Sequence, residues 1–458
     1  MFSEDIGFGY YDKAEDKANK AFELYEDGKM PQALDELNTA LEINPANSSW
    51  HFNKALTLDA MNRYDDAIAE YEIALQLCPE DIEILNSLAV DYTRTGQYDR
   101  AIDTFEHIQK LDPKFEPCYC NRIITYAEMG LHDLAEQMFY LAQQINPDCA
   151  LCYYNIGNSL FARGEYKRSV RCWLRTAELE PSHPQINYRI AQAYWADGDT
   201  AHSRERFLAE LRANPGDVDV IFDFALFLLE GGEIESAKEK FNRILELKSD
   251  FAPALFYLGE IAFSNGDYDQ AAELYSQAIQ KDKKLTGPCY RLAQLALMKE
   301  QKQKAKIYLL SELGLGPEDT DALVSMASMS LATGDLELST HCLLRAVDID
   351  RTNADAYYYL GVVTANRGRL EEAVEFLTQA LEVKPDHIPA LRDLACLYQA
   401  MGRLAEAQET VNRVRTLAGD DANLKALARR IRLAQKMERI KDSLQRFGPR
   451  FIVGKSRR

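Results

Sequence analysis

Apolar residues recur along this chain with a helical spacing that is interrupted at regular intervals. In the segment Ala150 to His183, apolar residues three and four positions apart predict one helix from about 151 to 162 and a second from about 166 to 178. Gly164 stands between them, where the chain must leave the helical conformation. Pro181 follows the second helix, which a proline cannot continue. The segment is therefore expected to form a helix–turn–helix unit.

This unit is repeated along most of the chain. It returns twelve times with a period of 34 residues, from Ala14 to Asp421, without insertion or deletion. Glycine occupies the turn position in ten copies, and Asn62 and Glu300 occupy it in the other two. A pattern of this length predicts a stack of helix pairs in which each pair buries its apolar face against its neighbours.

Two further positions of the repeat are restricted in size: one carries a small side chain and the other a large one. The position of Gly157 is Ala or Gly in eleven copies, and Ile123 is the exception. Small residues there allow the two helices of a pair to approach closely. The position of Trp173 is large in every copy, where it is expected to fill the space between one pair and the next: Leu37, Tyr71, Phe105, Phe139, Trp173, Phe207, Phe241, Tyr275, Leu309, Leu343, Leu377 and Val411.

The period, the turn glycine and the small and large positions together resemble the tetratricopeptide repeat. The resemblance implies an all-α fold, a right-handed α-solenoid superhelix whose first helices line a concave face that binds peptides or partner proteins. Four segments follow from it: an N-terminal flap over residues 1–13, twelve repeats over 14–421, a basic C-terminal capping helix over 422–448, and a flexible basic tail over 449–458.

Charge is distributed unevenly between the repeats and the C-terminal segment. The chain carries −19 overall, but residues 422–458 contain twelve Lys or Arg against two Asp or Glu, a balance of +10 that leaves −29 on residues 1–421. Such an acidic body argues against nucleic acid binding along the repeats. No apolar run is long enough to span a membrane, and no secretory signal is recognisable at the N-terminus. Nine cysteines, an odd number, fit a reducing compartment, so we expect a cytoplasmic protein.

The candidate binding site lies on the first helices of repeats five to nine. Residues at the positions of Tyr154, Asn158 and Phe161 share one helix face, which the family resemblance places on the concave side. An aromatic ring at the Tyr154 position is common in this family, and part of each ring is expected to pack on its own repeat. The predicted groove consists of Tyr154, Asn158, Phe161, Tyr188, Gln192, Trp195, Asp219, Phe222, Asp223, Leu229, Phe256, Glu260, Phe263 and Tyr290.

The composition of this groove indicates what it would bind. Its aromatic residues favour an apolar segment, and Asp219, Asp223 and Glu260 favour basic residues within that segment. The chain's own tail contains Arg450 and Phe451 and has this character, so self-association through the C-terminal tail is a candidate competitor.

Four cysteines gather at the starts of two neighbouring first helices. Cys118 and Cys120 open the first helix of repeat four, and Cys149 and Cys152 flank the start of the same helix in repeat five. The sequence favours inert packing, because cysteine is a good small core residue. Zinc ligation and a reversible disulfide are the alternatives. The alternative function is accordingly a metal- or redox-responsive regulatory subunit.

Catalytic motifs are absent from the sequence. There is no phosphate-binding loop, no nucleophile elbow and no dinucleotide fingerprint, and the seven histidines fall at scattered positions of the repeat. We therefore expect no cofactor and a non-enzymatic scaffold or adaptor that holds a peptide or partner segment in the concave groove.

Overall fold

The computed structural model describes the backbone of residues 5–419 and 421–446, and the side chains of residues 13–419 and 421–441. These residues form α-helices connected by short turns, with no strand among them. The helices pack into two compact units, of which the first ends at Phe227 and the second begins at Leu228, inside one helix. Each unit is described by itself below.

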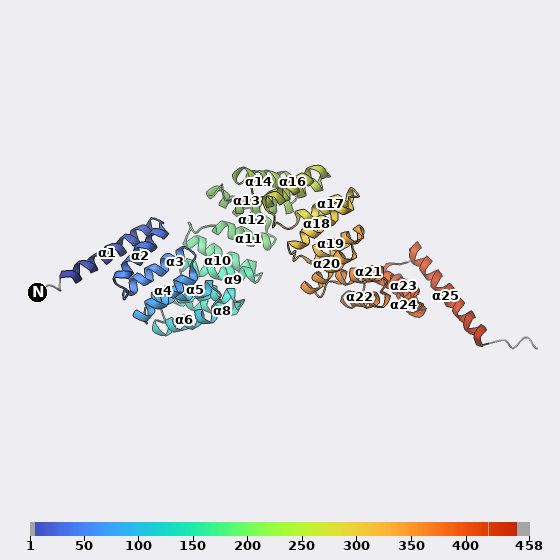
Figure 1. Cartoon of the computed structure of the whole chain (residues 1–458), viewed down its shortest axis with the longest axis horizontal. Coiled ribbons are helices and arrows are strands. Elements are labelled where there is room, and N and C mark those ends of the chain that lie inside the picture. Colours follow the sequence, from blue (N-terminus) through green and yellow to red (C-terminus); the bar gives the residue numbers. More distant parts are fainter. Residues whose placement is uncertain (1–4, 420, 447–458) are drawn as a thin grey trace, which may run out of the picture. The chain divides into compact units, whose positions relative to one another are not determined.

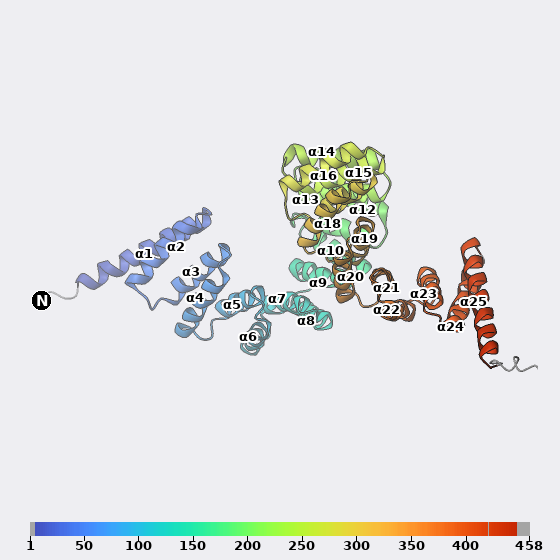
Figure 2. The same cartoon turned by 45° about the vertical axis from the view of Figure 1, so that its right-hand side comes forward.

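The described residues of the first unit form twelve complete helices and most of a thirteenth (Figures 1 and 2). Their bounds are α1 Asp5–Glu26, α2 Met30–Ile43, α3 Ser48–Ala60, α4 Tyr64–Leu77, α5 Ile82–Arg94, α6 Tyr98–Leu111, α7 Glu116–Glu128, α8 His132–Ile145, α9 Ala150–Ala162, α10 Tyr166–Leu179, α11 Ile186–Ala196, α12 Thr200–Ala213 and α13 Val218–Glu230.

The second unit begins near the end of α13 and continues the alternation of helices (Figure 1). Its remaining helices are α14 Ile234–Leu247, α15 Ala252–Ser264, α16 Tyr268–Lys281, α17 Pro288–Met298, α18 Lys302–Gly314, α19 Thr320–Thr333, α20 Leu336–Ile349, α21 Ala354–Asn366, α22 Leu370–Val383, α23 Ile388–Ala400, α24 Leu404–Ala418 and α25 Ala422–Arg446.

The predicted helix pairs and turns are confirmed. Helices α9 and α10 match the two helices expected in the segment Ala150–His183, and Gly164 between them has a φ of +77°, a left-handed conformation that glycine adopts without strain. The two non-glycine turn residues adopt it as well, with φ of +58° at Asn62 and +57° at Glu300. The turn geometry is therefore kept at Glu300 as well, although glutamate disfavours it, whereas asparagine tolerates it.

The helices at the two ends of the array can be compared with the segments expected there. Helix α1 begins at Asp5 and so includes residues 5–13, while the flap expected over residues 1–13 stays a prediction. The side chains of residues 1–12 lie outside the described part, and their capping role stays a prediction. Helix α25 packs on the last pair through Leu424, Ala428 and Ile431, whereas Leu433 is 61% exposed. The tail over 449–458 lies outside the described residues.

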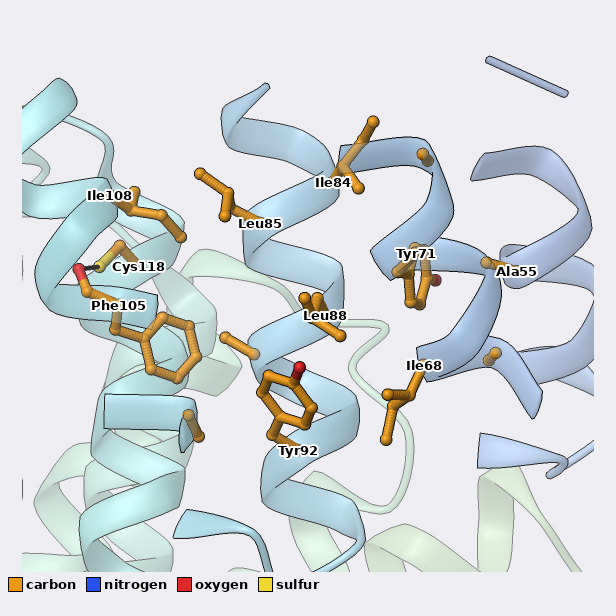
Figure 3. Packing of buried hydrophobic residues seen from close by; sticks show 14 of the residues in the cluster. Ala55, Ile68, Tyr71, Ile84, Leu85, Leu88, Tyr92, Phe105, Ile108 and Cys118 are labelled. Atoms are coloured by element: carbon orange, nitrogen blue, oxygen red, sulfur yellow. Dashed lines mark hydrogen bonds between the residues drawn. The ribbon is translucent and has the colours of Figure 1, made fainter. Parts of the chain in front are cut away.

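The core of each repeat is built from the large position of the second helix. Figure 3 shows Tyr71 and Phe105 on either side of α5, with Leu88 of that helix in the same cluster. Both rings are fully buried. Each second helix thus packs against its own first helix and the next one, which is the arrangement expected of a solenoid.

The residue at the small position depends on the volume of the side chain at the large position. A Cβ atom added to Gly157 would lie 2.5 Å from Nε1 of Trp173, and one added to Gly259 would lie 2.6 Å from Cε1 of Tyr275. Repeats with alanine at this position include those with Ala89 and Ala191, whose large residues are Phe105 and Phe207. In the fifth repeat the glycine is therefore required by the volume of the indole.

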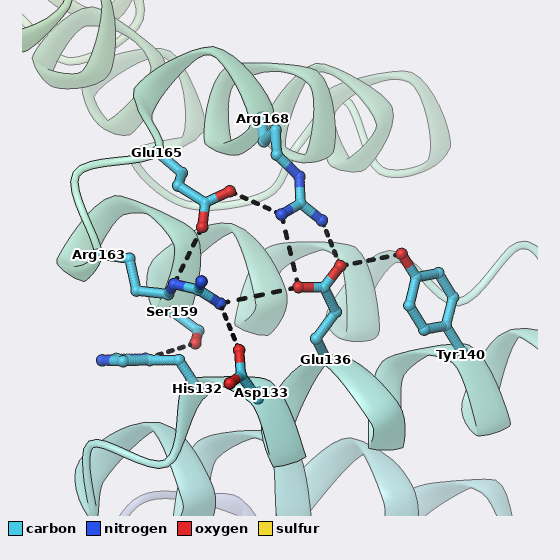
Figure 4. A network of polar contacts seen from close by, with 8 residues as sticks. All are labelled: His132, Asp133, Glu136, Tyr140, Ser159, Arg163, Glu165 and Arg168. Atoms are coloured by element: carbon cyan, nitrogen blue, oxygen red, sulfur yellow. Dashed lines mark hydrogen bonds and ion pairs between the residues drawn. The ribbon is translucent and has the colours of Figure 1, made fainter.

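Polar contacts reinforce the stacking of repeats four and five (Figure 4). Arg168 of α10 forms a short contact with Glu136 of α8, and it also reaches Oε2 of Glu165 at 2.6 Å. Arg163 in the turn before α10 lies 3.0 Å from Oδ1 of Asp133. The hydrogen bond from Arg168 lowers the pKa of the Glu136 carboxyl below its ordinary value. Ion pairs of this kind are worth more in a network than singly.

A buried carboxyl interrupts the apolar packing of the early repeats. Asp91 of α5 is 1% exposed and accepts a hydrogen bond of 3.2 Å from Nη1 of Arg94 through Oδ1, while Oδ2 has no partner. Arg94 also contacts Asp59 of α3. Burial and the neighbouring charge of Asp59 raise the pKa of Asp91 to about 7, and Arg94 opposes them in part.

The fit between Gly157 and Trp173 predicts a compensated pair of substitutions. Gly157→Ala should destabilise the fold by about 1–3 kcal/mol, because the added methyl group overlaps the indole. Gly157→Ala combined with Trp173→Phe recreates the alanine and phenylalanine of neighbouring repeats, so the double variant should lose less stability than the two single changes summed. Urea unfolding followed by circular dichroism measures all three variants, and strictly additive losses would contradict the steric account.

The raised pKa of Asp91 predicts a dependence of stability on pH. The unfolded carboxyl titrates near pH 4, whereas the folded one holds its proton to about pH 7. The folded state therefore binds more protons between these values, and this stabilisation is lost as the pH rises through that window. Asp91→Asn should match the wild type near pH 4 and exceed its stability at pH 8.

Thermal unfolding of both chains across this pH range measures the difference. Asp103→Asn on the exposed side of α6 is the matched control and should leave the pH profile unchanged. An Asp91→Asn variant with the same pH profile as the wild type would refute the assignment.

Candidate binding face

The odd-numbered helices of the first unit carry a row of aromatic rings. Tyr154 and Phe161 lie on α9, Tyr188 and Trp195 on α11, and Phe222 on α13. All five side chains are partly buried, so each ring has one part packed on the protein and another in contact with solvent. We call these five residues the aromatic row. Helix α9 contacts α10, and α10 contacts α11, which places successive members of the row on successive repeats.

Rings of the row pack against other ring side chains of the same unit. The ring centroid of Phe161 is 5.6 Å from that of Trp173, and the Trp195 ring meets Phe227 edge-on at 5.8 Å. The Tyr154 ring lies 4.4 Å from the imidazole of His183. The row therefore contributes to stability as well as offering surface, and truncating Trp195 would remove core contacts too.

A carboxylate joins two helices within this face. Oδ2 of Asp223 accepts hydrogen bonds from the Tyr188 hydroxyl at 2.7 Å and from Nε2 of Gln192 at 2.9 Å. Burial and this contact raise the pKa of the Tyr188 hydroxyl above its ordinary value. Asp223 is thus hydrogen-bonded within the protein, and its expected attraction for basic residues of a ligand stays a prediction. Asp219, one turn earlier, is exposed.

The remaining predicted groove residues lie in the second unit, where a similar face is arranged around one ion pair. Glu260 of α15 accepts 2.8 Å and 2.5 Å hydrogen bonds from Nε and Nη2 of Arg291 on α17, and a third from the Tyr275 hydroxyl. The Arg291 guanidinium also lies 5.2 Å from the ring centroid of Phe263. The negative charge of Glu260 is therefore balanced within the protein by Arg291. Leu229, Phe256, Phe263 and Tyr290 are partly buried.

The residues of the predicted groove are divided between the two units, and the groove itself stays a prediction. The structure places Tyr154, Asn158 and the residues up to Asp223 in the first unit, and those from Leu229 to Tyr290 in the second. Their spacing predicts that the residues within each unit share one face of the odd-numbered helices. A continuous strip across both units stays a prediction.

The structure has an apolar hollow that does not belong to the predicted groove. It lies between α1, α2 and α3, has a volume of about 60 Å³, and is lined by Phe22, Tyr25 and Leu56 among others. Phe22 is 60% exposed there. The signal was present in the sequence, because Phe22 and Tyr25 stand at the odd-helix positions equivalent to Asn158 and Phe161.

The cysteines form a cluster different from the predicted one. Cys118 is fully buried, and its thiol donates to the carbonyl oxygen of Phe105 at 3.2 Å (Figure 3). Cys120, Cys149 and Cys152 are joined instead by Glu116, with all four ligand atoms within 4.8 Å of one another. Glu116 was missed because no rule of cysteine spacing points to a carboxylate two residues before Cys118.

No helix in the described part of the chain is both long enough and apolar enough to cross a membrane. All nine cysteines are free thiols.

Comparison with protein-family models matches tetratricopeptide repeats along the chain. Models of this description match residues 154–218 and 222–285, residues 262–311 and 364–431, and residues 342–375. A model described as the N-terminal repeat region of Psidin matches residues 15–146. Comparison with curated proteins gives no match.

Solved structures of the same repeat type resemble the chain at low sequence identity. The APC/C hetero-tetramer Cut9-Hcn1 is 14% identical over 90% of this chain and 95% of that one, with a TM-score of 0.41. Yeast Tom70 is 15% identical over 94% and 97%, with a TM-score of 0.38. A repeat protein from Parabacteroides merdae is 17% identical over 58% and 99%, with a TM-score of 0.44. We transfer no residue role from them.

The family models together cover most of the sequence, and the described helices follow the 34-residue pattern from the first repeat to the last. The resemblance inferred from the turn glycine and the small and large positions is thereby confirmed. The chain belongs to the tetratricopeptide-repeat family, whose members act in general as scaffolds for protein interactions.

Proposed function

We propose that this protein is a non-enzymatic scaffold that binds a segment of a partner protein along the odd-helix face of its first unit. The observation that carries the proposal is the aromatic row on α9, α11 and α13, whose rings are anchored on the core and partly open to solvent. Rings held in this way lose little conformational entropy on binding, which makes them good contact points for a partner.

The polar groups among the rings suit a partner whose main chain is accessible. The amide of Asn158 lies on the same face, and Gln192 is held in place by Asp223. Amides offer both donors and acceptors to an extended or helical segment, while the rings supply apolar contact area. This combination of a few fixed polar groups with an apolar surface is typical of binding sites in general.

Charge is expected to act at longer range than these contacts. Asp223 and Glu260 already have partners within the protein, so the attraction for basic residues rests on exposed Asp219 and on the net charge of −29 over residues 1–421. We therefore propose an apolar partner segment with basic residues beside it, whose association slows as salt is added. The basic C-terminal tail of a second copy remains a candidate for the same face. A cytoplasmic location, with no nucleic acid on the acidic repeats, belongs to the same proposal.

Replacing two rings of the row tests the site. Trp195→Ala with Phe222→Ala should weaken binding of the partner that co-purifies with the chain by at least about tenfold, since aromatic contacts at the centre of an interface are worth about 2 kcal/mol or more each. Calorimetry measures the affinity. Because Trp195 also packs on Phe227, circular dichroism and thermal unfolding must be measured alongside.

A second variant separates binding from folding. Asn158→Arg adds a bulky charge to a partly exposed position of the same face and should weaken the same partner without removing a core contact. Leu208→Ala on α12 changes an exposed apolar residue of the same repeat as Trp195 and is the matched control. If Asn158→Arg and the double variant, both folded, bind as tightly as the wild type, the partner binds elsewhere.

A further inference from the structure

Three thiols and one carboxylate converge where the fourth and fifth repeats meet. Glu116 and Cys120 lie on the first turns of α7, and Cys149 and Cys152 lie at the start of α9. The sulfur atoms of Cys120 and Cys149 are 4.0 Å apart, and the Cys152 thiol lies 3.0 Å from Oε1 of Glu116. Cys120 and Cys152 are almost fully buried, while Glu116 and Cys149 are partly exposed. The cluster therefore has two inner ligands and two outer ones, and it is reachable from solvent.

The local fold holds these groups in place. Cys149 is the N-cap residue of α9, and its sulfur accepts a 3.2 Å hydrogen bond from the backbone N–H of Cys152. Asn155, one turn further on, donates to the backbone carbonyl of Cys120 at 3.3 Å and to its sulfur at 3.7 Å. Helices α7 and α9 are neighbours in the stack. The 34-residue period thus brings two pairs of ligands from sequence-distant turns to one point.

Four groups that lose a proton on binding a metal converge at this point, with their ligand atoms all within 4.8 Å of one another. A cation among them would balance the charge of three thiolates and one carboxylate.

The distances fit a tetrahedral metal better than a disulfide. With bonds of about 2.3 Å from zinc to sulfur, two sulfurs on one zinc ion lie roughly 3.8 Å apart, close to the 4.0 Å between Cys120 and Cys149. A disulfide requires its two sulfurs to be about 2.05 Å apart, so Cys120 and Cys149 would have to move toward each other by nearly half their separation. Three thiolates and one carboxylate are also ligands that zinc accepts.

We propose that Glu116, Cys120, Cys149 and Cys152 form a structural zinc site that ties α7 of the fourth repeat to α9 of the fifth. Zinc displaces the thiol protons, so each thiolate and the carboxylate donates one pair of electrons to the ion and no oxidant is needed. Asn155 orients the Cys120 side of the site from the next turn. Because each repeat otherwise contacts only its neighbours, such a tie strengthens one interface of the array selectively.

Metal content of the full chain tests the site. The protein, purified under reducing conditions with zinc supplied and then dialysed, should hold about one zinc ion per chain by elemental analysis. Cobalt added to the metal-free chain should give the visible and near-ultraviolet bands of tetrahedral cobalt bound to thiolates. Removing zinc with a chelator should lower the hydrogen-exchange protection of α7 and α9 before that of other helices.

Variants distinguish this site from the set that cysteine spacing alone suggests, in which Cys118 takes the place of Glu116. Cys149→Ser should abolish tight zinc binding while keeping the fold, because serine is itself a good N-cap residue. Glu116→Gln should weaken zinc binding by at least about tenfold, as the loss of a charged ligand implies. Cys118→Ser and Cys78→Ser are the matched controls and should retain one zinc ion per chain, since Cys118 points to Phe105 and Cys78 lies apart from the cluster.

Three results would overturn the proposal. The reduced wild-type chain could fail to retain zinc, Cys118→Ser could lose it while Cys149→Ser keeps it, or mass spectrometry of the chain purified without oxygen could find Cys120 joined to Cys149 by a disulfide. Unchanged zinc affinity in Glu116→Gln would remove the carboxylate from the ligand set. The variants of the aromatic row leave this measurement untouched, so the two proposals fail independently.

Discussion

The close approach of the two helices within each repeat is the constraint on which the rest of the structure depends. It is possible because a small residue of the first helix faces a large residue of the second, as Gly157 faces Trp173. The large residue is fully buried, as Tyr71 and Phe105 illustrate, and it also reaches the next repeat. Without this contact a single helix pair would leave its apolar face in water, and no repeat of this length could remain folded alone.

The same packing fixes the positions of the side chains that the odd-numbered helices present to a partner. The aromatic row is fixed from behind by core rings, so its exposed edges have defined positions before any partner arrives. Two of the predicted groove carboxylates are likewise occupied. In the first unit Asp223 is bonded to Tyr188 and Gln192, and in the second unit Glu260 is bonded to Arg291 and Tyr275. A preformed surface of this kind pays little for ordering on association.

Features that repeat with the period were predictable from sequence, and those that depend on one side-chain direction were not. The helix pairs, the turn at Gly164 and the shared face of Tyr154 and Phe161 follow from spacing alone. The spacing could not tell that the thiol of Cys118 turns toward the Phe105 carbonyl while Glu116, two residues earlier, turns toward Cys152. Nor could it tell that Asp223 accepts two hydrogen bonds from another repeat, because such contacts depend on how neighbouring repeats are rotated.

The pairing of Gly157 with Trp173, of Gly259 with Tyr275 and of Gly361 with Leu377 has an evolutionary meaning. Both members of each pair belong to the same 34-residue unit, so the compensation for volume is inherited together. A duplication or deletion of one whole unit by unequal recombination carries a matched pair with it and leaves no overlap or void inside the copied repeat. Array length in such a protein is therefore free to change by whole units, whereas a crossover between the two helices of one unit would separate the glycine from the ring it accommodates.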